Sequence, residues 1–196
     1  MIIVGDIGNT ETKICLVNSK NKIIKRVTFS TKKISFLLLK KYLSNLNIKN
    51  KLINKCLFCS VVPKSFVIIK NYFNDVYKVR CHELKKLKIR KLIKIKVNYK
   101  QIGSDRLANA ISVINNKDNF IILDFGTATT FDVLIKDIYH GGVIAPGVRL
   151  SLNTLADKAS QIPFIDLKKT NKIIGLNTIS AVRAGFFLGY QGLIDN

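Results

Sequence analysis

The chain has 196 residues, of which 47% are apolar, and its 33 lysines and arginines far outnumber its 12 aspartates and glutamates. This length suffices for one large or two small domains with a self-supporting core, and the composition is typical of a globular chain. No apolar run reaches the roughly 18 residues of a membrane span, and an acid directly after the first short strand argues against a secretory signal.

Strand-like and helical patterns alternate along the first half of the chain. They predict strands at residues 2–7, 12–17 and 23–29, a helix over about 34–46, a strand over 52–62 ended by Pro63, and a helix near 64–73. A basic connector then leads to Gly103, which opens an amphipathic helix running to about residue 114. This half therefore reads as a mixed α/β unit.

The second half begins with another strand pattern. Strands are predicted at residues 120–123, 129–135 and 138–139, followed by a glycine-rich loop over 141–147 and a helix over about 150–160. The last element, from about 177 to 194, reads as a helix whose spaced glycines (Gly185, Gly189 and Gly192) give it one smooth face for close packing.

The formal charge of +21 has two interpretations. One is binding to nucleic acid or an anionic surface, for which the lysine-rich stretch 85–96 is the best candidate. The other is composition alone, because lysine, asparagine and isoleucine are abundant everywhere in the chain. The stretch partly alternates like a strand with a lysine-rich solvent face and lacks interleaved aromatics for base stacking, so we favour composition.

The cysteines show no paired spacing and fit a reducing, cytoplasmic compartment; they are Cys15, Cys56, Cys59 and Cys81. Cys56 and Cys59 would point to opposite faces of a strand. A zinc site would also need two further ligands, and only His82 and His140 are histidines. We therefore expect buried structural thiols rather than a metal site.

Two segments share one local design, an apolar strand leading into an Asp-x-Gly turn with a second strand after it. The first is Asp6-Ile7-Gly8 and the second is Asp124-Phe125-Gly126. A glycine lets the main chain approach a ligand closely, and a carboxylate beside exposed backbone N–H groups suits a phosphate with its counter-cation. Two such turns facing each other would clamp a nucleotide, which predicts an ATP-using phosphotransferase.

With these pieces in order, the chain resembles the type III pantothenate kinases of the actin and sugar-kinase superfamily. The matching segments occur in the family order and span nearly the whole chain: Asp6-Ile7-Gly8-Asn9-Thr10-Glu11-Thr12-Lys13, Ser60-Val61-Val62-Pro63, Gly103-Ser104-Asp105-Arg106, Asp124-Phe125-Gly126-Thr127-Ala128-Thr129-Thr130-Phe131-Asp132, the loop 141–150 with Leu155, and Asn177-Thr178-Ile179-Ser180-Ala181. Relatives continue for several tens of residues past the position of Asn196, so the second lobe is shortened here.

The resemblance implies an α/β fold of two ribonuclease-H-like lobes, with mixed sheets flanked by helices and the nucleotide in the cleft between them. We place the lobes at residues 1–115 and 116–196. It also implies transfer of the ATP γ-phosphoryl group to pantothenate, the first step of coenzyme A synthesis, by a cytoplasmic homodimer that uses Mg²⁺ and a monovalent cation, K⁺ or NH₄⁺.

The resemblance assigns the nucleotide side of the site to both Asp-x-Gly turns. Asp6 would bind Mg²⁺, and the phosphates would lie against Asp6, Ile7, Gly8, Asn9, Thr10, Glu11, Thr12 and Lys13. Asp124 would bind K⁺, and Thr127 would contact ATP. The alternative for the first segment is a simple turn without a ligand.

The acceptor side falls on Gly103, Ser104, Asp105, Arg106 and Thr178. Asp105 is the implied general base, although an acid at a helix start is also a common stabilising cap. Arg106 would bind the pantothenate carboxylate with two hydrogen bonds, or else be a solvated surface charge. Thr178 would contact pantothenate or cap the last helix.

Other acidic and aromatic positions depart from the family pattern or have a different role. Asp132 and Asp157 are expected to be structural. Family members usually carry a pocket tyrosine where this chain has Lys96, so either Tyr99 replaces it or the contact is lost.

Two other functions remain open. One is a catalytically weakened relative acting as a basic nucleic-acid-binding or regulatory protein, and the other is a kinase for a different small molecule. The intact acidic set argues against the first, and the Gly103–Arg106 segment argues against the second.

Overall fold

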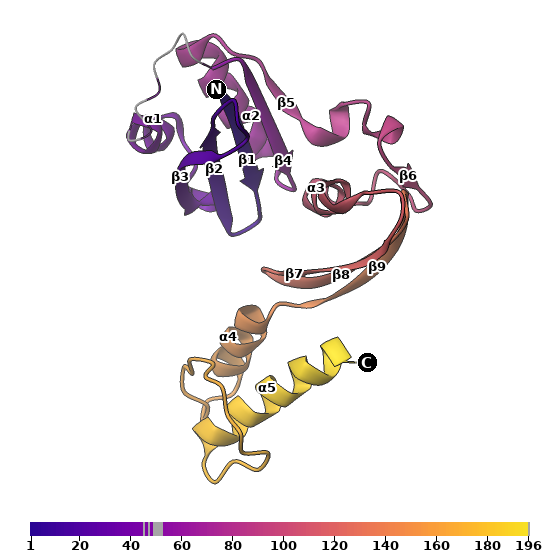
Figure 1. Cartoon of the computed structure of the whole chain (residues 1–196). Coiled ribbons are helices and arrows are strands. Elements are labelled where there is room, and N and C mark those ends of the chain that lie inside the picture. Colours follow the sequence, from indigo (N-terminus) through magenta and orange to yellow (C-terminus); the bar gives the residue numbers. More distant parts are fainter. Residues whose placement is uncertain (45, 47, 49–52, 196) are drawn as a thin grey trace. The chain divides into compact units, whose positions relative to one another are not determined.

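The computed structural model describes residues 1–44, 46, 48 and 53–195. The chain divides into two compact units, one formed by Met1–Ile122 with Asp132–Gly141 and the other by Leu123–Phe131 with Gly142–Asn196 (Figure 1). The predicted lobe boundary at residue 115 stays a prediction of domain organisation. Each unit is described by itself.

The first unit is built around a five-stranded sheet with the order β3-β2-β1-β4-β5. Its strands are β1 (Ile2–Ile7), β2 (Glu11–Val17), β3 (Ile23–Ser30), β4 (Lys55–Ser60) and β5 (Cys81–Glu83). The first three strands form an antiparallel meander, whereas β4 runs parallel to both β1 and β5. The four strands predicted for this half are confirmed, although the fourth, predicted over 52–62, spans Lys55–Ser60 and residue 52 lies outside the described residues. Strand β5 was missed because three residues carry too little pattern to recognise.

Helices and aromatic side chains complete the first core. Helix α1 (Phe36–Ser44) and helix α2 (Pro63–Tyr77) bury apolar faces in the same cluster as Ile3, Ile7 and Ile14. Pro63 stands at the start of α2, where its missing N–H costs nothing, and Lys78 ends that helix in a left-handed conformation.

The basic connector is mostly irregular, although its sequence partly alternates like a strand. Its residues form two short 3₁₀ turns, Leu84–Lys86 and Ile89–Lys91, and only Lys94–Ile95 pairs as a strand, β6. Leu84, Ile89 and Ile93 are buried at irregular spacing. The apparent alternation therefore reflected apolar anchors in a tightly turning segment rather than one pleated face.

A second sheet has the order β6-β9-β8-β7. Its longer strands are β7 (Asn119–Phe125), β8 (Ala128–Ile135) and β9 (Ile138–Pro146). Helix α3 (Ser104–Val113) shares a core with this sheet through Leu107, Ala110 and Leu134. The predicted loop at 141–147 is wrong: the strand continues through Gly141 and Gly142, because Val143 and Ile144 that follow favour extended backbone.

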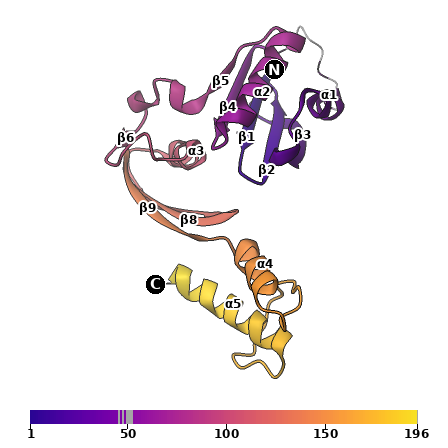
Figure 2. The same cartoon turned by 180° about the vertical axis from the view of Figure 1, so that it is seen from behind.

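The helices α4 (Val148–Lys158) and α5 (Thr178–Asp195) form most of the second unit (Figures 1 and 2), and both were predicted. The Tyr190 hydroxyl on α5 donates to the Pro146 carbonyl over 2.8 Å and lies 3.3 Å from the Ser151 hydroxyl on α4. None of the helices in the described part of the chain has both the length and the hydrophobicity needed to cross a bilayer.

Gly5, the residue before Asp6, tests how tightly the first core is packed. A Cβ at this position would overlap the ring of Phe58, which is fully buried between Phe66 and Phe73. We expect Gly5→Ala to lower the free energy of unfolding by about 1–3 kcal/mol through overpacking, measured by urea denaturation.

Gly185→Ala is the matched control, because nothing lies within 4 Å of a Cβ at Gly185 in helix α5. Replacing a helical glycine by alanine should be neutral or stabilising, by about 0.5–1 kcal/mol. Equal urea midpoints for the two variants would show that Phe58 yields without cost.

Candidate functional site

The first Asp-x-Gly turn joins β1 to β2 and is held rigidly. The Gly8 N–H donates to the Glu11 carbonyl over 3.0 Å, and the Thr31 hydroxyl donates to the Gly8 carbonyl over 2.7 Å. Thr31 lies just after β3 and also meets the Thr12 hydroxyl at 2.9 Å. The contacts of Thr31, which follows β3, thus fix the backbone of the turn. They leave the tip of the turn exposed.

The predicted phosphate-binding residues divide into two groups. Ile7 and Thr12 are fully buried in the core, so they hold the backbone of the turn in place. Asp6 is half-buried, and the others that carry polar side chains are exposed: Asn9, Thr10, Glu11 and Lys13. Lys13 lies directly opposite Asp6 in the strand register.

Asp105 lies in the first turn of α3, where the helix dipole favours an acid. Its Oδ1 accepts the Arg106 N–H over 2.8 Å, but Asp105 is not the capping residue, because Gly103 holds the N-cap position and makes no side-chain cap hydrogen bond. A Cβ on Gly103 would overlap that same Oδ1, so the glycine leaves space for this carboxylate position.

Three acidic side chains from separate parts of the chain lie near Cys59. Burial raises the pKa of the Cys59 thiol to about 12, and the charges of Asp6, Asp105 and Glu83 add to the increase. The two motif acids, distant in sequence, therefore both lie near the end of β4. Glu83 was missed by sequence reasoning, because an isolated Glu in a basic stretch carries no motif.

Ser104 links the same elements. Its hydroxyl donates to Glu83 Oε1 and accepts the Ser60 N–H over 3.2 Å, and the residue is 1% exposed. The Ser104 hydroxyl thus fastens α3 to β4 and β5 and is already occupied by these two contacts.

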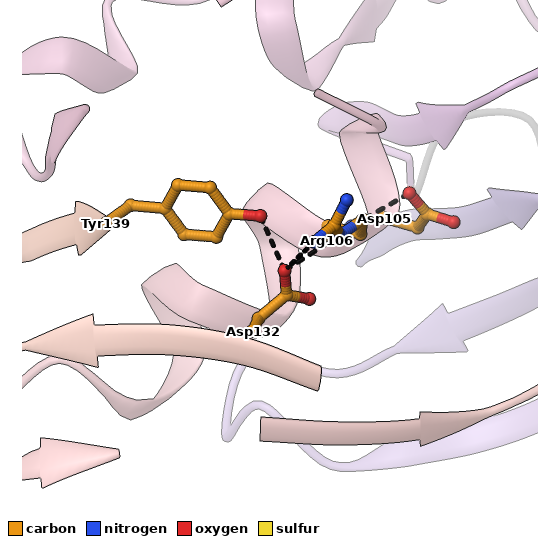
Figure 3. Close-up of polar contacts among 4 residues, drawn as sticks. All are labelled: Asp105, Arg106, Asp132 and Tyr139. Atoms are coloured by element: carbon orange, nitrogen blue, oxygen red, sulfur yellow. Dashed lines mark hydrogen bonds and ion pairs between the residues drawn. The ribbon is translucent and has the colours of Figure 1, made fainter. Parts of the chain in front are cut away.

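Arg106 is not a solvated surface charge, so that alternative is wrong (Figure 3). Its Nε donates to Asp132 Oδ1 over 2.8 Å, and Tyr139 Oη donates to the same oxygen over 2.5 Å. Burial alone would lower the pKa of Arg106, but the hydrogen bond and charge of Asp132 raise it above its ordinary value. Burial and then the hydrogen bond to Asp132 raise the pKa of Tyr139.

The second Asp-x-Gly turn, between β7 and β8, lies in the second unit. The Gly126 N–H donates to the Ala128 carbonyl over 2.9 Å, and the Gly147 N–H donates to the Thr127 carbonyl over 3.0 Å. A Cβ at Gly147 would overlap the Gly126 carbonyl oxygen. The main chain of Gly126, Thr127 and Gly147 is therefore closely packed in this turn, which follows Asp124, while the Thr127 side chain is exposed.

Thr178 is exposed at the first position of α5, but it does not cap that helix. Asn177 does so: its Oδ1 accepts the Ser180 N–H over 2.9 Å, and the Ser180 hydroxyl accepts the Asn177 N–H over 3.0 Å. The capping interpretation of Thr178 is wrong by one residue, since Asn and Thr are both good caps.

Tyr99 is held within the basic connector. Its hydroxyl donates to the Lys85 carbonyl over 2.7 Å, and the Arg90 guanidinium lies 4.7 Å from its ring centroid. Lys96, at the usual tyrosine position, is exposed. Whether Tyr99 serves the acceptor pocket stays a prediction.

No cluster of three or more His, Cys, Asp or Glu side chains placed to hold a metal occurs among the residues that the structure describes. Mg²⁺ is usually held by one or two carboxylates together with substrate phosphates and water. The sparse acidic set near Cys59 therefore fits Mg²⁺ arriving with a nucleotide better than a resident ion.

Comparisons with solved structures bear on the fold. A putative Baf family transcriptional activator from Campylobacter jejuni covers 98% of this chain and 77% of its own, with a TM-score of 0.54 at 19% identity. A putative 2-dehydro-3-deoxygalactonokinase from Sinorhizobium meliloti covers 100% of this chain and 82% of its own, with a TM-score of 0.57 at 8% identity. The predicted α/β fold, with mixed sheets flanked by helices, is confirmed.

Sequence comparisons bear on the family. The model of the family described as type III pantothenate kinase matches residues 2–196. A type III pantothenate kinase from Pelagibacter ubique is 80% identical over the whole chain, which spans 79% of that protein. One from a Sulfurihydrogenibium species is 35% identical over the whole chain and 80% of its own length. The chain therefore belongs to the type III pantothenate kinase family.

Proposed function

We propose that this chain transfers the γ-phosphoryl group of ATP to the terminal hydroxyl of pantothenate, the first step of coenzyme A synthesis. The family match over residues 2–196 supports the reaction. The single structural observation behind it is the placement of Asp6 and Asp105 near the end of β4: Asp6 lies opposite Cys59 in the strand register, and Ser104, next to Asp105, accepts the Ser60 N–H. A phosphate-side acid and an acceptor-side acid thus lie near the same strand end.

Phosphoryl transfer asks the protein for positioning and charge neutralisation more than for covalent chemistry. In this proposal Asp105 accepts the proton of the pantothenate hydroxyl. The Arg106 N–H already holds Oδ1 of that carboxylate, which fixes the direction of the remaining oxygen. Arg106 binds the pantothenate carboxylate, the main chain of Gly103 and Ser104 lines the acceptor pocket, and Thr178 adds a hydroxyl contact.

The nucleotide side rests on the two turns. The main chain and exposed side chains of residues 6–13 receive the phosphates, with Asp6 holding Mg²⁺, and Thr127 contacts ATP. Asp124 holds a monovalent cation, K⁺ or NH₄⁺, with help from main-chain carbonyls of its turn. When bound, the two cations neutralise charge on the phosphates.

We also propose that the protein works as a cytoplasmic homodimer. Support comes from the resemblance and from exposed apolar side chains on one face of β7, namely Ile121, Leu123 and Phe125. The family match does not support the alternative, a nucleic-acid-binding or regulatory relative. The aromatic ring next to the stretch 85–96 on which a base could stack is that of Tyr99, and Lys85 and Arg90 already lie over it.

Asp105→Asn tests the proposed base. The amide keeps the size of the side chain but cannot take a proton, so kcat should fall by about 100-fold or more. The measurement is formation of phosphopantothenate by mass spectrometry, with far-UV circular dichroism as the check on folding. A variant that keeps near-wild-type kcat would remove Asp105 from this role.

Gly103→Ala tests whether the position of that carboxylate matters. Gly103 has an ordinary extended conformation that alanine also adopts, so the added methyl acts through its overlap with Asp105 Oδ1. We expect kcat to drop about tenfold with little loss of stability, because a small displacement of a reacting group is costly. Unchanged kcat would show that Asp105 can move without penalty.

Asp124→Asn tests the monovalent cation site. At an oxygen-donor site the number of charged ligands sets cation affinity, so the K⁺ concentration for half-maximal activity should rise about tenfold. Asp157→Asn on α4, an exposed acid of the same unit, is the matched control. An identical K⁺ response in both variants would argue that K⁺ binds elsewhere.

A further inference from the structure

Three side chains from three separate elements meet around one buried oxygen atom (Figure 3). Asp132 comes from β8, Tyr139 from β9 and Arg106 from α3, and all three belong to the first unit. Asp132 is 0% exposed and Tyr139 is 1% exposed. A carboxylate is rarely buried this completely unless it has a fixed partner.

The contacts are concentrated on Oδ1 of Asp132. Nε of Arg106 donates to it over 2.8 Å, Nη2 lies 2.5 Å away in ionic contact, and Tyr139 Oη donates to it over 2.5 Å. Nε and Nη2 form one edge of the guanidinium group. That edge is therefore occupied by Asp132, and Figure 3 shows the remaining guanidinium nitrogen pointing away from it.

We propose that Asp132 is a positioning residue for substrate recognition, and that Tyr139 holds Asp132 in place. The proposal rests on the proposed function, in which Arg106 binds the pantothenate carboxylate. An unrestrained arginine side chain would lose considerable rotamer freedom on binding a ligand. With one edge already fixed, the Nη1 end is presented in a single orientation and this cost is reduced.

The test compares pantothenate with its neutral alcohol analogue, in which the carboxylate is replaced by a hydroxymethyl group. Both keep the hydroxyl that is phosphorylated. In Asp132→Asn we expect the kcat/KM preference for pantothenate over the alcohol to fall about tenfold or more, mainly through KM. The KM for ATP and the kcat/KM for the alcohol should change by less than about threefold.

Three further variants sharpen the result. Tyr139→Phe removes one donor to Asp132 and should lower the same preference by about threefold, and it serves as the test if Asp132→Asn does not fold. In an Arg106→Ala background Asp132→Asn should have no further effect on the preference, since the two act as one unit. Asp137→Asn, which removes only an exposed contact to Lys94, is the control.

The outcomes separate this proposal from the proposed function. A wild-type chain without pantothenate-dependent turnover overturns both. An active wild type whose Asp132→Asn and Tyr139→Phe variants keep the full preference for the carboxylate overturns the positioning role alone. So does an Asp132→Asn variant that loses activity equally toward both acceptors, because that is the behaviour of a merely structural residue.

Discussion

The parallel pairing of β1 with β4 is the constraint on which the acidic site depends. Its register sets Asp6 opposite Cys59, and the N–H of the next residue, Ser60, donates to the Ser104 hydroxyl that anchors α3. Because side chains alternate along a strand, a slip of one residue would send Asp6 to the other face of the sheet. The Gly5–Phe58 contact, one step earlier in the same register, packs closely enough to oppose such a slip.

The high positive charge does not govern the site. The residues near Cys59 that raise its pKa are acids, in a chain where acids are scarce. A surplus of lysine elsewhere would favour the approach of anionic substrates such as ATP through the general field of the protein. In the proposed function the acids near Cys59 bind a cation or accept a proton, and they do not attract the substrate.

Much of the fold could be predicted from the sequence because its strands and helices are long and regularly patterned. The strand at 2–7 and the final helix are examples. Gly141 and Gly142 favoured a loop where the structure has a strand, since glycine is also tolerated within a strand that curves. The acids of the two Asp-x-Gly turns and of Gly103–Arg106 could be proposed as site residues because each lies in a motif.

The remaining parts of the site depend on contacts between distant segments, which no local pattern encodes. Glu83 joins the acids near Cys59 only because β5 lies beside β4. Asp132 is the partner of Arg106 only because β8 packs near α3. Asp132 was expected to be structural, and its burial agrees with that, but its contacts tie it to the one arginine of the acceptor motif.

The most direct test of the whole account is ADP release by the purified chain with Mg²⁺ and ATP, measured with and without pantothenate in potassium and then in sodium buffer. We expect release that requires pantothenate and is faster in potassium. Absence of pantothenate-dependent release from folded protein in both buffers would contradict it.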